Sequence, residues 1–207
     1  MQRSLVGSEM CIRDRQELNA SNPSWTVLFE RGVTQSLIKQ YTNSVNTYSS
    51  AIELNPSNPF LYLNRSTTRA EMIDFISSIE NNVQTLTMDD KGTTRARVRD
   101  QVSRTYDYSE AIDDMLAADR LLPGVPYIYF NLGNLYCLSS KFVESVDSYT
   151  KAISVYPYMG DAYFNRGLVL IYLKDKEKGC IDLSRAGELG VSDAYSVISK
   201  YCEEEKN

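Results

Sequence analysis

The sequence contains no histidine among its 207 residues. Histidine is the commonest general base near neutral pH and the commonest metal ligand, so its absence removes the side chain on which many hydrolytic and metal-dependent sites depend. A GxSxG nucleophile motif, a phosphate-binding loop and an HExxH zinc motif are absent as well. We therefore expect no catalytic, metal-binding or cofactor-binding residues, and we do not expect the protein to be an enzyme.

Cysteine is scarce, and the cysteines that are present lack a metal-binding spacing. The four stand at Cys11, Cys137, Cys180 and Cys202, with no CxxC pair. This spacing predicts neither a zinc site nor a disulfide framework. The last three cysteines are compatible with a reducing or an oxidising compartment, because they need not pair. We interpret Cys137 and Cys180 as buried thiols rather than nucleophiles, because the sequence gives them no basic neighbour.

Long apolar runs and an excess of positive charge are missing too. No run of 18 or more apolar residues exists, so no segment is expected to cross a membrane. The formal net charge is −5, from 22 Lys and Arg against 27 Asp and Glu. The chain as a whole is therefore not expected to bind nucleic acid through phosphate contacts.

Residues 4–15 read SLVGSEMCIRDR, and this string resembles the translation of a transposase sequencing adapter. We set such a segment aside in fold analysis, as is done with an expression tag. We expect residues 1–15 to be a disordered artefact and the genuine chain to begin near Gln16. We also expect the chain to be the C-terminal fragment of a longer protein. The alternative is that residues 1–15 are a genuine disordered leader.

What the sequence does contain is an internal repeat between Pro126 and Val191. Four positions recur at an offset of 34 residues: Tyr129 and Tyr163, Asn131 and Asn165, Gly133 and Gly167, and Ala152 and Ala186. A fixed period of this length, with two amphipathic helices in each copy, is typical of a helical solenoid. The predicted fold class is therefore all-α, with helix-turn-helix repeats.

Less regular copies complete the predicted domain, which spans 16–207. The repeats are 25–58, 59–83 joined to 106–125, 126–159 and 160–193, with an irregular insertion at 84–105 and a C-terminal capping helix at 192–205. Small residues are expected where paired helices lie close together, and prolines where the second helix of a pair ends. These structural positions are Gly32, Ala51, Pro56, Ala111, Ala118, Pro123, Gly133, Ala152, Pro157, Gly167 and Ala186. Ser66 takes the glycine place in the second repeat.

The insertion at 84–105 interrupts the helical pattern. A turn at 89–92 lies between alternating residues, which leaves three alternatives open: a β-hairpin or mobile arm, a charged helical extension, and a degenerate fifth repeat. A local basic cluster follows, made of Arg95, Arg97, Arg99 and Arg104. The cluster could bind a phosphate or an acidic partner, but we favour a solvated arm.

The third repeat resembles the tetratricopeptide repeat. The resemblance consists of an aromatic–x–Asn–x–Gly–x–x–aromatic opening, a later alanine and a closing proline: Tyr129, Asn131, Gly133, Tyr136, Ala152 and Pro157. It covers about 16–207 apart from the insertion, and it implies a right-handed superhelix. The departures are Ser145 where a small alanine is usual, Leu170 in place of an aromatic residue, and Val191 in place of the final proline.

The tail of the last repeat drifts toward the related Sel1-like repeat, through Gly179, Cys180 and the segment 186–190. As a whole, the chain resembles the C-terminal part of exported repeat proteins of Gram-negative bacteria. This resemblance implies a bacterial cell envelope or periplasmic location, with the cytoplasm as the alternative.

The tetratricopeptide resemblance also implies a concave groove, lined by the first helices of successive repeats, in which an extended peptide or a partner helix lies. The residues carried over are Phe60, Leu63, Asn64, Tyr127, Phe130, Asn131, Asn134, Phe164, Asn165, Leu168 and Tyr172. This aromatic and amide surface suits peptide recognition, because aromatic rings bury a large area and asparagine pairs with a ligand backbone. The alternative for each aromatic residue is simple packing between helices.

The family's carboxylate-binding version of the groove needs paired lysine and arginine beside the asparagines. Arg65 and Arg166 are the nearest basic residues in this sequence, so we expect no capture of an acidic C-terminus.

Three function classes compete, and we favour a non-catalytic protein-interaction module or scaffold with a protein or peptide partner. The alternative is a nucleic-acid or glycan binder that uses the arginine-rich insertion and the tyrosine-rich groove. An enzyme is disfavoured, because carboxylate pairs such as Asp113 and Asp114 are expected on the polar face of a helix, exposed to solvent.

Overall fold

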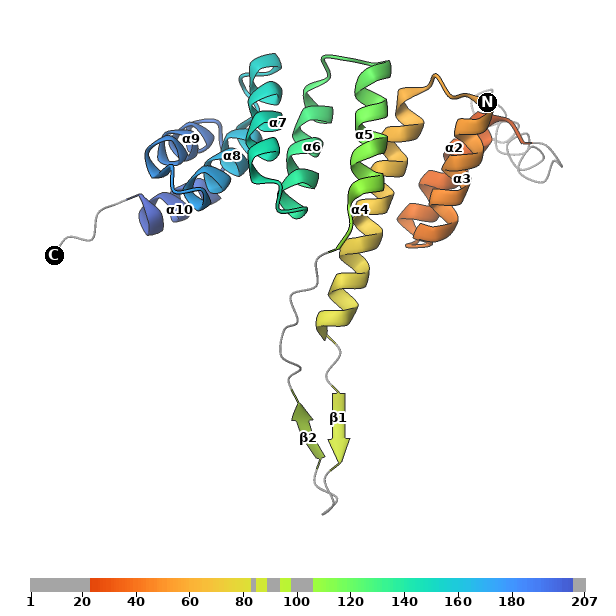
Figure 1. Cartoon of the computed structure of the whole chain (residues 1–207), viewed down its shortest axis with the longest axis horizontal. Coiled ribbons are helices and arrows are strands. Elements are labelled where there is room, and N and C mark those ends of the chain that lie inside the picture. Colours follow the sequence, from red (N-terminus) through yellow and green to blue (C-terminus); the bar gives the residue numbers. More distant parts are fainter. Residues whose placement is uncertain (1–22, 83–84, 89–93, 98–105, 203–207) are drawn as a thin grey trace, which may run out of the picture.

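A computed structural model describes residues 23–82, 85–88, 94–97 and 106–202 (Figure 1). Its helices are α2 (Trp25–Leu37), α3 (Tyr41–Leu54), α4 (Pro59–Asn82), α5 (Ser109–Leu121), α6 (Pro126–Leu138), α7 (Phe142–Val155), α8 (Gly160–Tyr172), α9 (Lys176–Glu188) and α10 (Asp193–Tyr201). Two short strands, β1 (Thr85–Met88) and β2 (Thr94–Arg97), lie between α4 and α5. Residues 1–15, with their resemblance to a sequencing adapter, lie outside the described residues.

The helices pack in sequence order, each against the next. The pairs are α2 with α3, α4 with α5, α6 with α7, and α8 with α9, and successive pairs meet through α3 on α4, α5 on α6, and α7 on α8. Figure 1 shows the pairs side by side in a curved row, from α2 and α3 at one end to α9 and α10 at the other. The predicted all-α helical-repeat solenoid is confirmed.

The buried side chains follow the same order, in three successive clusters. The first surrounds Tyr48 between α2, α3 and α4. The second surrounds Met115 between α4, α5 and α6, and the third surrounds Tyr149 between α6, α7 and α8. Each cluster is therefore built by neighbouring helices only, as in other solenoids.

Glycine allows the two helices of a pair to approach closely. A Cβ atom on Gly133 would lie 2.4 Å from Cε1 of Tyr149, and a Cβ atom on Gly32 would lie 2.7 Å from Cε1 of Tyr48. Both distances are far shorter than a carbon–carbon contact in a packed interior. Each tyrosine ring therefore occupies the place that any larger side chain would need.

A serine hydroxyl joins the two helices at the same contacts. Ser145 Oγ donates a hydrogen bond to the carbonyl oxygen of Gly133 at 2.8 Å, and the α2–α3 pair has the equivalent bond. In the α4–α5 pair the direction is reversed, and Ser66 Oγ donates to the carbonyl oxygen of Ala111 at 2.7 Å. The serine that departs from the usual alanine at position 145 thus satisfies its own polar group while it links the helices.

The alanine and proline positions lie at helix contacts and helix ends. All five predicted alanines are buried: Ala51, Ala118, Ala152 and Ala186 have no exposed surface, and Ala111 is 1% exposed. Pro56, Pro123 and Pro157 each stand two residues beyond the last residue of α3, α5 and α7. Proline has no backbone N–H to donate to a further helical turn, so it suits the start of the following connection.

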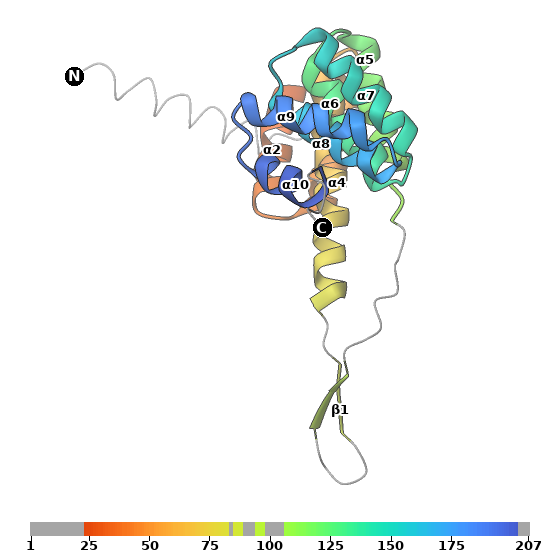
Figure 2. The same cartoon turned by 90° about the vertical axis from the view of Figure 1, so that its left-hand side faces the viewer.

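β1 and β2 form an antiparallel hairpin, which is one of the alternatives left open by the sequence. The pairing brings Thr85 opposite Arg97 and Met88 opposite Thr94. With 24 residues, α4 is longer than the 13-residue α6, and the hairpin stands out from the helical row beyond the end of α4 (Figures 1 and 2). Arg99 and Arg104 of the predicted basic cluster lie outside the described residues.

The expectation that Asp114 is exposed to solvent was wrong. Its exposed fraction is 4%, and its two carboxylate oxygens accept hydrogen bonds from Nε and Nη2 of Arg65 at 2.9 Å and 2.6 Å. Arg69 donates a further bond to the same carboxylate. Arg65 and Asp114 are 49 positions apart in the sequence, with the insertion between them, so their proximity was not evident in the sequence. Asp113, next to it, is exposed as expected.

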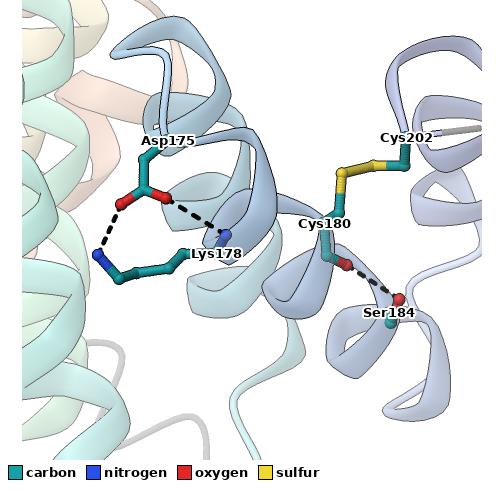
Figure 3. The surroundings of a disulfide bond; sticks show 5 residues. All are labelled: Asp175, Lys178, Cys180, Ser184 and Cys202. Carbon is teal, nitrogen blue, oxygen red and sulfur yellow. Dashed lines mark hydrogen bonds and ion pairs between the residues drawn. A yellow bond between two sulfur atoms is a disulfide. The ribbon is translucent and has the colours of Figure 1, made fainter. Parts of the chain in front are cut away.

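The expectation that Cys180 is a buried thiol was also wrong, because Cys180 takes part in a disulfide that the spacing of the cysteines did not indicate. Cys180 in α9 and Cys202 at the end of α10 form a disulfide, with Cα atoms 5.8 Å apart (Figure 3). α10 folds back onto α9, which brings together two residues separated by 22 positions. Spacing along the chain does not reveal such a reversal. Cys137 is a free thiol.

α10 covers the end of the helical row. Ala194 is fully buried, and the ring of Tyr195 lies so close to Gly187 that a Cβ atom there would be 2.9 Å from it. α10 lies within the range expected for the capping helix, of which residues 203–205 fall outside the described residues. None of the helices in the described ranges has the length and apolar character needed to cross a membrane.

Candidate partner-binding surface

The predicted groove residues lie on the first helix of three successive pairs. They are Phe60, Leu63 and Asn64 on α4, Tyr127, Phe130, Asn131 and Asn134 on α6, and Phe164, Asn165, Leu168 and Tyr172 on α8. The side chains of Phe60, Tyr127 and Tyr172 are 55%, 62% and 65% exposed. The others, apart from Leu168, are half-buried. Three large aromatic side chains thus remain open to a partner.

Several groove asparagines form hydrogen bonds within the protein. Asn134 Oδ1 accepts a bond from the Tyr149 hydroxyl at 2.7 Å and another from Asn165 Nδ2 at 3.0 Å, which joins α6 to α8. Asn64 Nδ2 donates to the carbonyl oxygen of Phe60 at 2.8 Å. These amides position the helices as well as offering polar groups at the surface.

Packing accounts for part of the burial of the groove side chains. Phe130 lies against Tyr149, with ring centroids 5.9 Å apart, and Tyr172 lies against Phe142 at 4.6 Å. Leu63 packs on the cluster around Met115. These contacts fix the orientation of the three side chains, so the surface they present is preformed.

The surface is hollowed where α6 and α8 begin. This aromatic hollow, as we call it, has a volume of about 360 Å³. Its lining comes from α6, from the α7–α8 junction and from the α9–α10 turn: Tyr127, Phe130, Tyr156, Tyr158, Met159, Gly160, Asp161, Leu189, Gly190 and Val191. Two predicted groove residues therefore meet side chains from two inter-helix turns.

Tyrosine rings dominate the accessible part of the hollow. Tyr156 and Tyr158 stand edge to face with ring centroids 6.1 Å apart, and they are 44% and 66% exposed. Met159, which also lines the hollow, is buried. Asp161 is the only charged residue among the described residues that line the hollow.

Close backbone packing holds the walls of the hollow in place. A Cβ atom on Gly160 would lie 2.9 Å from Cγ2 of Val191, so the start of α8 lies directly against the α9–α10 turn. Gly190 has a φ of 95°, a conformation that glycine adopts without strain. Met159 N donates to the carbonyl oxygen of Tyr156 at 3.2 Å within the other turn.

The sequence predicted Tyr127 and Phe130 as surface residues but did not predict the turn residues of the hollow. The available signal was the run Tyr156-Pro157-Tyr158, in which two aromatic residues flank the proline that follows a helix end. Asp161 and the 189–191 turn carried no comparable signal, because their place beside α6 depends on how two helix pairs stack.

A second hollow, of about 390 Å³, lies between α7, α8 and α9. Its walls include Val146, Leu170 and Ile181, and its charged groups already have partners within the protein. Arg166 Nε and Nη2 donate to Asp182 at 2.7 Å and 2.8 Å. Lys178 Nζ lies 2.7 Å from an Asp175 carboxylate oxygen (Figure 3). Its charges are therefore already balanced, and we assign it no ligand.

Two potentially reactive groups beside α6, the Cys137 thiol and the Tyr149 hydroxyl, are not activated. Burial raises the pKa of the Cys137 thiol, which keeps the thiol protonated at neutral pH. Burial also raises the pKa of the Tyr149 hydroxyl. Within the described ranges, no three His, Cys, Asp or Glu side chains gather where they could hold a metal ion.

Comparison with known proteins identifies the fold. No protein-family model and no curated protein matches the sequence. A crystal structure of MamA aligns with 94% of this chain and 95% of its own, at 18% identity and a TM-score of 0.65. MamA 41-end from Desulfovibrio magneticus RS-1 aligns with 82% of this chain and 77% of its own, at 12% identity and a TM-score of 0.60.

Tetratricopeptide-repeat domains, abbreviated TPR, also match. The first TPR of Spaghetti (RPAP3), solved bound to the HSP90 peptide SRMEEVD, aligns with 73% of this chain and 94% of its own, at 16% identity and a TM-score of 0.54. The Arabidopsis OM64 TPR domain aligns with 72% of this chain and 96% of its own, at 18% identity and a TM-score of 0.52. Identities this low speak to the fold alone. In its fold, the chain is a tetratricopeptide-repeat-like protein.

Proposed function

We propose that this chain is a non-catalytic protein-interaction module or scaffold, which binds an extended peptide or a partner helix along α4, α6 and α8. The aromatic hollow carries the proposal, because there Tyr127 and Phe130 meet the exposed rings of Tyr156 and Tyr158. Exposed aromatic side chains in a concave site are typical anchors for a protein partner. Phe60 and Tyr172 add exposed aromatic area on α4 and α8.

The class of peptide is expected to differ from the one in the RPAP3 structure. That TPR domain holds the acidic peptide SRMEEVD. In this chain, Arg65 and Arg166 form bidentate ion pairs with Asp114 and Asp182, so neither guanidinium is available to a ligand carboxylate. We expect SRMEEVD to bind weakly or not at all, and amidation of its C-terminus to change nothing.

Selection of peptides from a displayed dodecapeptide library on the whole chain tests the proposal. We expect enriched peptides with Kd values of about micromolar, measured by fluorescence anisotropy. Tyr127→Ala should weaken their binding by about tenfold or more, because an exposed anchor is removed without disturbing the core. Lys151→Ala, at an exposed position of α7, is the matched control and should leave Kd unchanged. The proposal fails if no peptide is enriched, or if enriched peptides bind Tyr127→Ala and Phe60→Ala as tightly as the parent.

We also propose that the chain is the C-terminal part of a longer exported repeat protein. The Cys180–Cys202 disulfide supports an oxidising compartment such as a bacterial periplasm, because cytosolic thiols are kept reduced. Mass spectrometry of the protein alkylated in its source cells distinguishes the compartments. A disulfide-linked peptide pair supports export, and alkylation of both thiols points to the cytoplasm.

A second candidate function is nucleic-acid or glycan binding through the insertion. The observation that favours it is the hairpin with Arg95 and Arg97 in β2, set apart from the helical row (Figure 1). Deletion of 84–105 separates the two functions. A peptide surface on α4, α6 and α8 should keep its affinity for selected peptides, whereas an arm-dependent binder should lose its affinity for a polynucleotide or an oligosaccharide.

A further inference from the structure

The lining of the aromatic hollow complements positive charge. Among the described residues that line it, Asp161 is the only one with a charged side chain, and this carboxylate is exposed in the first turn of α8. A ligand carboxylate or phosphate would lie beside a like charge, whereas a cation would lie beside an opposite one. The formal charge of the whole chain, −5, acts in the same direction.

The helix ends around the hollow do not reverse this preference. α6, α8 and α10 begin around the hollow, at Pro126, Gly160 and Asp193, with the positive ends of their dipoles. α7 and α9 end close by, at Val155 and Glu188, with the negative ends of theirs. The negative ends partly offset the positive ones, and each helix end is equivalent to only about half an elementary charge. Among the described residues of the lining, the Asp161 carboxylate remains as the only full charge.

The walls suit a flat cation in particular. Tyr127, Tyr156 and Tyr158 line the hollow with exposed aromatic rings, and the face of an aromatic ring attracts cations through its quadrupole. The chain makes the same contact internally: the guanidinium carbon of Arg65 lies 5.9 Å from the ring centroid of Tyr62, and that of Arg166 lies 5.6 Å from Tyr163. Two cation–π contacts between an arginine and a tyrosine thus already occur within this fold.

Guanidinium fits these walls better than ammonium does. It is planar, stacks on aromatic rings, and pairs with a carboxylate through two parallel hydrogen bonds, as Arg166 does with Asp182. A volume of about 360 Å³ accommodates one such side chain with part of its backbone. We infer that the aromatic hollow binds an arginine side chain of the partner, stacked on the tyrosine rings and paired with Asp161. This inference rests on the proposed peptide-binding function.

The first test uses a single residue as the probe, N-acetyl-arginine amide, in an NMR titration of the whole chain. N-acetyl-citrulline amide is the matched control, since it has nearly the same shape but no charge. We expect saturable shifts of the Gly160, Asp161 and Gly190 amide signals, with a Kd of about millimolar for so small a ligand. Citrulline should bind about tenfold more weakly or not at all. Equal binding of the two probes, or shifts confined to other residues, would overturn the inference.

Variants then tie the binding to the residues of the hollow. Asp161→Asn and Tyr158→Ala change exposed side chains, so both proteins should fold, and each should weaken binding of the arginine probe by about fivefold or more. Tyr201→Ala removes a tyrosine that is also exposed but lies at the end of α10, and its Kd should match the parent. Retained affinity in Asp161→Asn would contradict the role of the carboxylate, and retained affinity in Tyr158→Ala would contradict stacking.

The outcomes separate this inference from the proposed function. If displayed peptides bind in a Tyr127-dependent manner but contain no arginine, and the arginine probe does not bind, the inference fails and the proposed function stands. If the arginine probe binds at the hollow but no peptide is enriched, the hollow is a cation site and the proposed peptide-binding function fails.

Discussion

At the scale of single residues, the closest contacts lie between a glycine of one helix and a tyrosine of its partner. Gly133→Leu places four carbon atoms where the Tyr149 ring already lies, because even a Cβ atom there would be 2.4 Å from the ring. We expect α6 and α7 to be forced apart at a cost of about 1–3 kcal/mol or more in the free energy of unfolding. Thermal denaturation followed by circular dichroism measures the effect as a lower Tm.

The matched control for this substitution is Lys151→Leu, which adds the same side chain at an exposed position of α7. Its effect should stay within about 0.5 kcal/mol, because an exposed helical position has no neighbour to displace. An unchanged Tm in Gly133→Leu would show that the pairing of α6 with α7 has a different register from the one described.

A second residue-scale feature is the buried ion pair that recurs in two helix pairs. Arg166 and Asp182 are the counterparts of Arg65 and Asp114, and the Arg166 guanidinium also donates to Thr150 Oγ1 of the preceding pair at 2.9 Å. In the α6–α7 pair the corresponding positions are Leu132 and Ser148, so both charged residues of the ion pair are replaced by uncharged ones. The chain itself therefore contains an uncharged version of the same contact.

This internal variation predicts a strongly coupled double-mutant cycle. Arg166→Leu alone leaves the Asp182 carboxylate buried without its partner, and it should cost about 3 kcal/mol or more in the free energy of unfolding. Arg166→Leu combined with Asp182→Ser reproduces the α6–α7 arrangement and should recover most of that loss. Urea unfolding of the two single variants and the double variant measures the coupling. Additive losses would contradict it.

At the scale of elements, the disulfide ties the last helix to the rest of the row. Cys202→Ser should release the end of α10 from α9, and the closed loop spans 22 positions, so the loss of chain constraint is worth about 3 kcal/mol. We expect faster hydrogen exchange of the α10 amides and a lower Tm. Dithiothreitol should reproduce both changes in the parent protein and leave Cys202→Ser unaffected. Unchanged exchange in α10 would contradict a stabilising role for this bond.

Elements with a local signal were predictable from the sequence, and those that depend on chain reversal were not. The glycine, alanine and proline positions anticipated the paired helices, since Gly133 and Pro157 act within one helix pair. The Cys180–Cys202 bond required α10 to fold back. The Arg65–Asp114 pair required α5 to return across the insertion. The aromatic hollow forms only because the turn at Gly190 lies beside the start of α8, which the sequence does not show. Each of these depends on contacts between segments whose spacing in the sequence is arbitrary.

At the scale of the whole molecule, one buried tyrosine hydroxyl occurs in each of the three clusters of the solenoid. Burial, with a smaller contribution from the charge of Glu71, raises the pKa of Tyr48 to about 12. Burial, with the nearby charge of Asp74, raises the pKa of Tyr108 to about 12, and burial raises that of Tyr149 in the same direction. All three clusters therefore favour the protonated phenol.

The shared direction of these shifts predicts alkaline unfolding of the whole row. An unfolded tyrosine loses its proton near pH 10, whereas the folded protein retains it toward pH 12, so the stabilisation is complete below about pH 10 and is lost as the pH rises. We expect Tm to fall steadily above about pH 10, with tyrosinate absorbance appearing together with unfolding. Tyr48→Phe removes one of the three groups and should make the fall of Tm shallower. A Tm that stays constant above pH 10 would show that deprotonation of these tyrosines does not destabilise the solenoid. A Tyr48→Phe variant whose Tm falls as steeply as that of the parent would show that Tyr48 does not contribute to the alkaline unfolding.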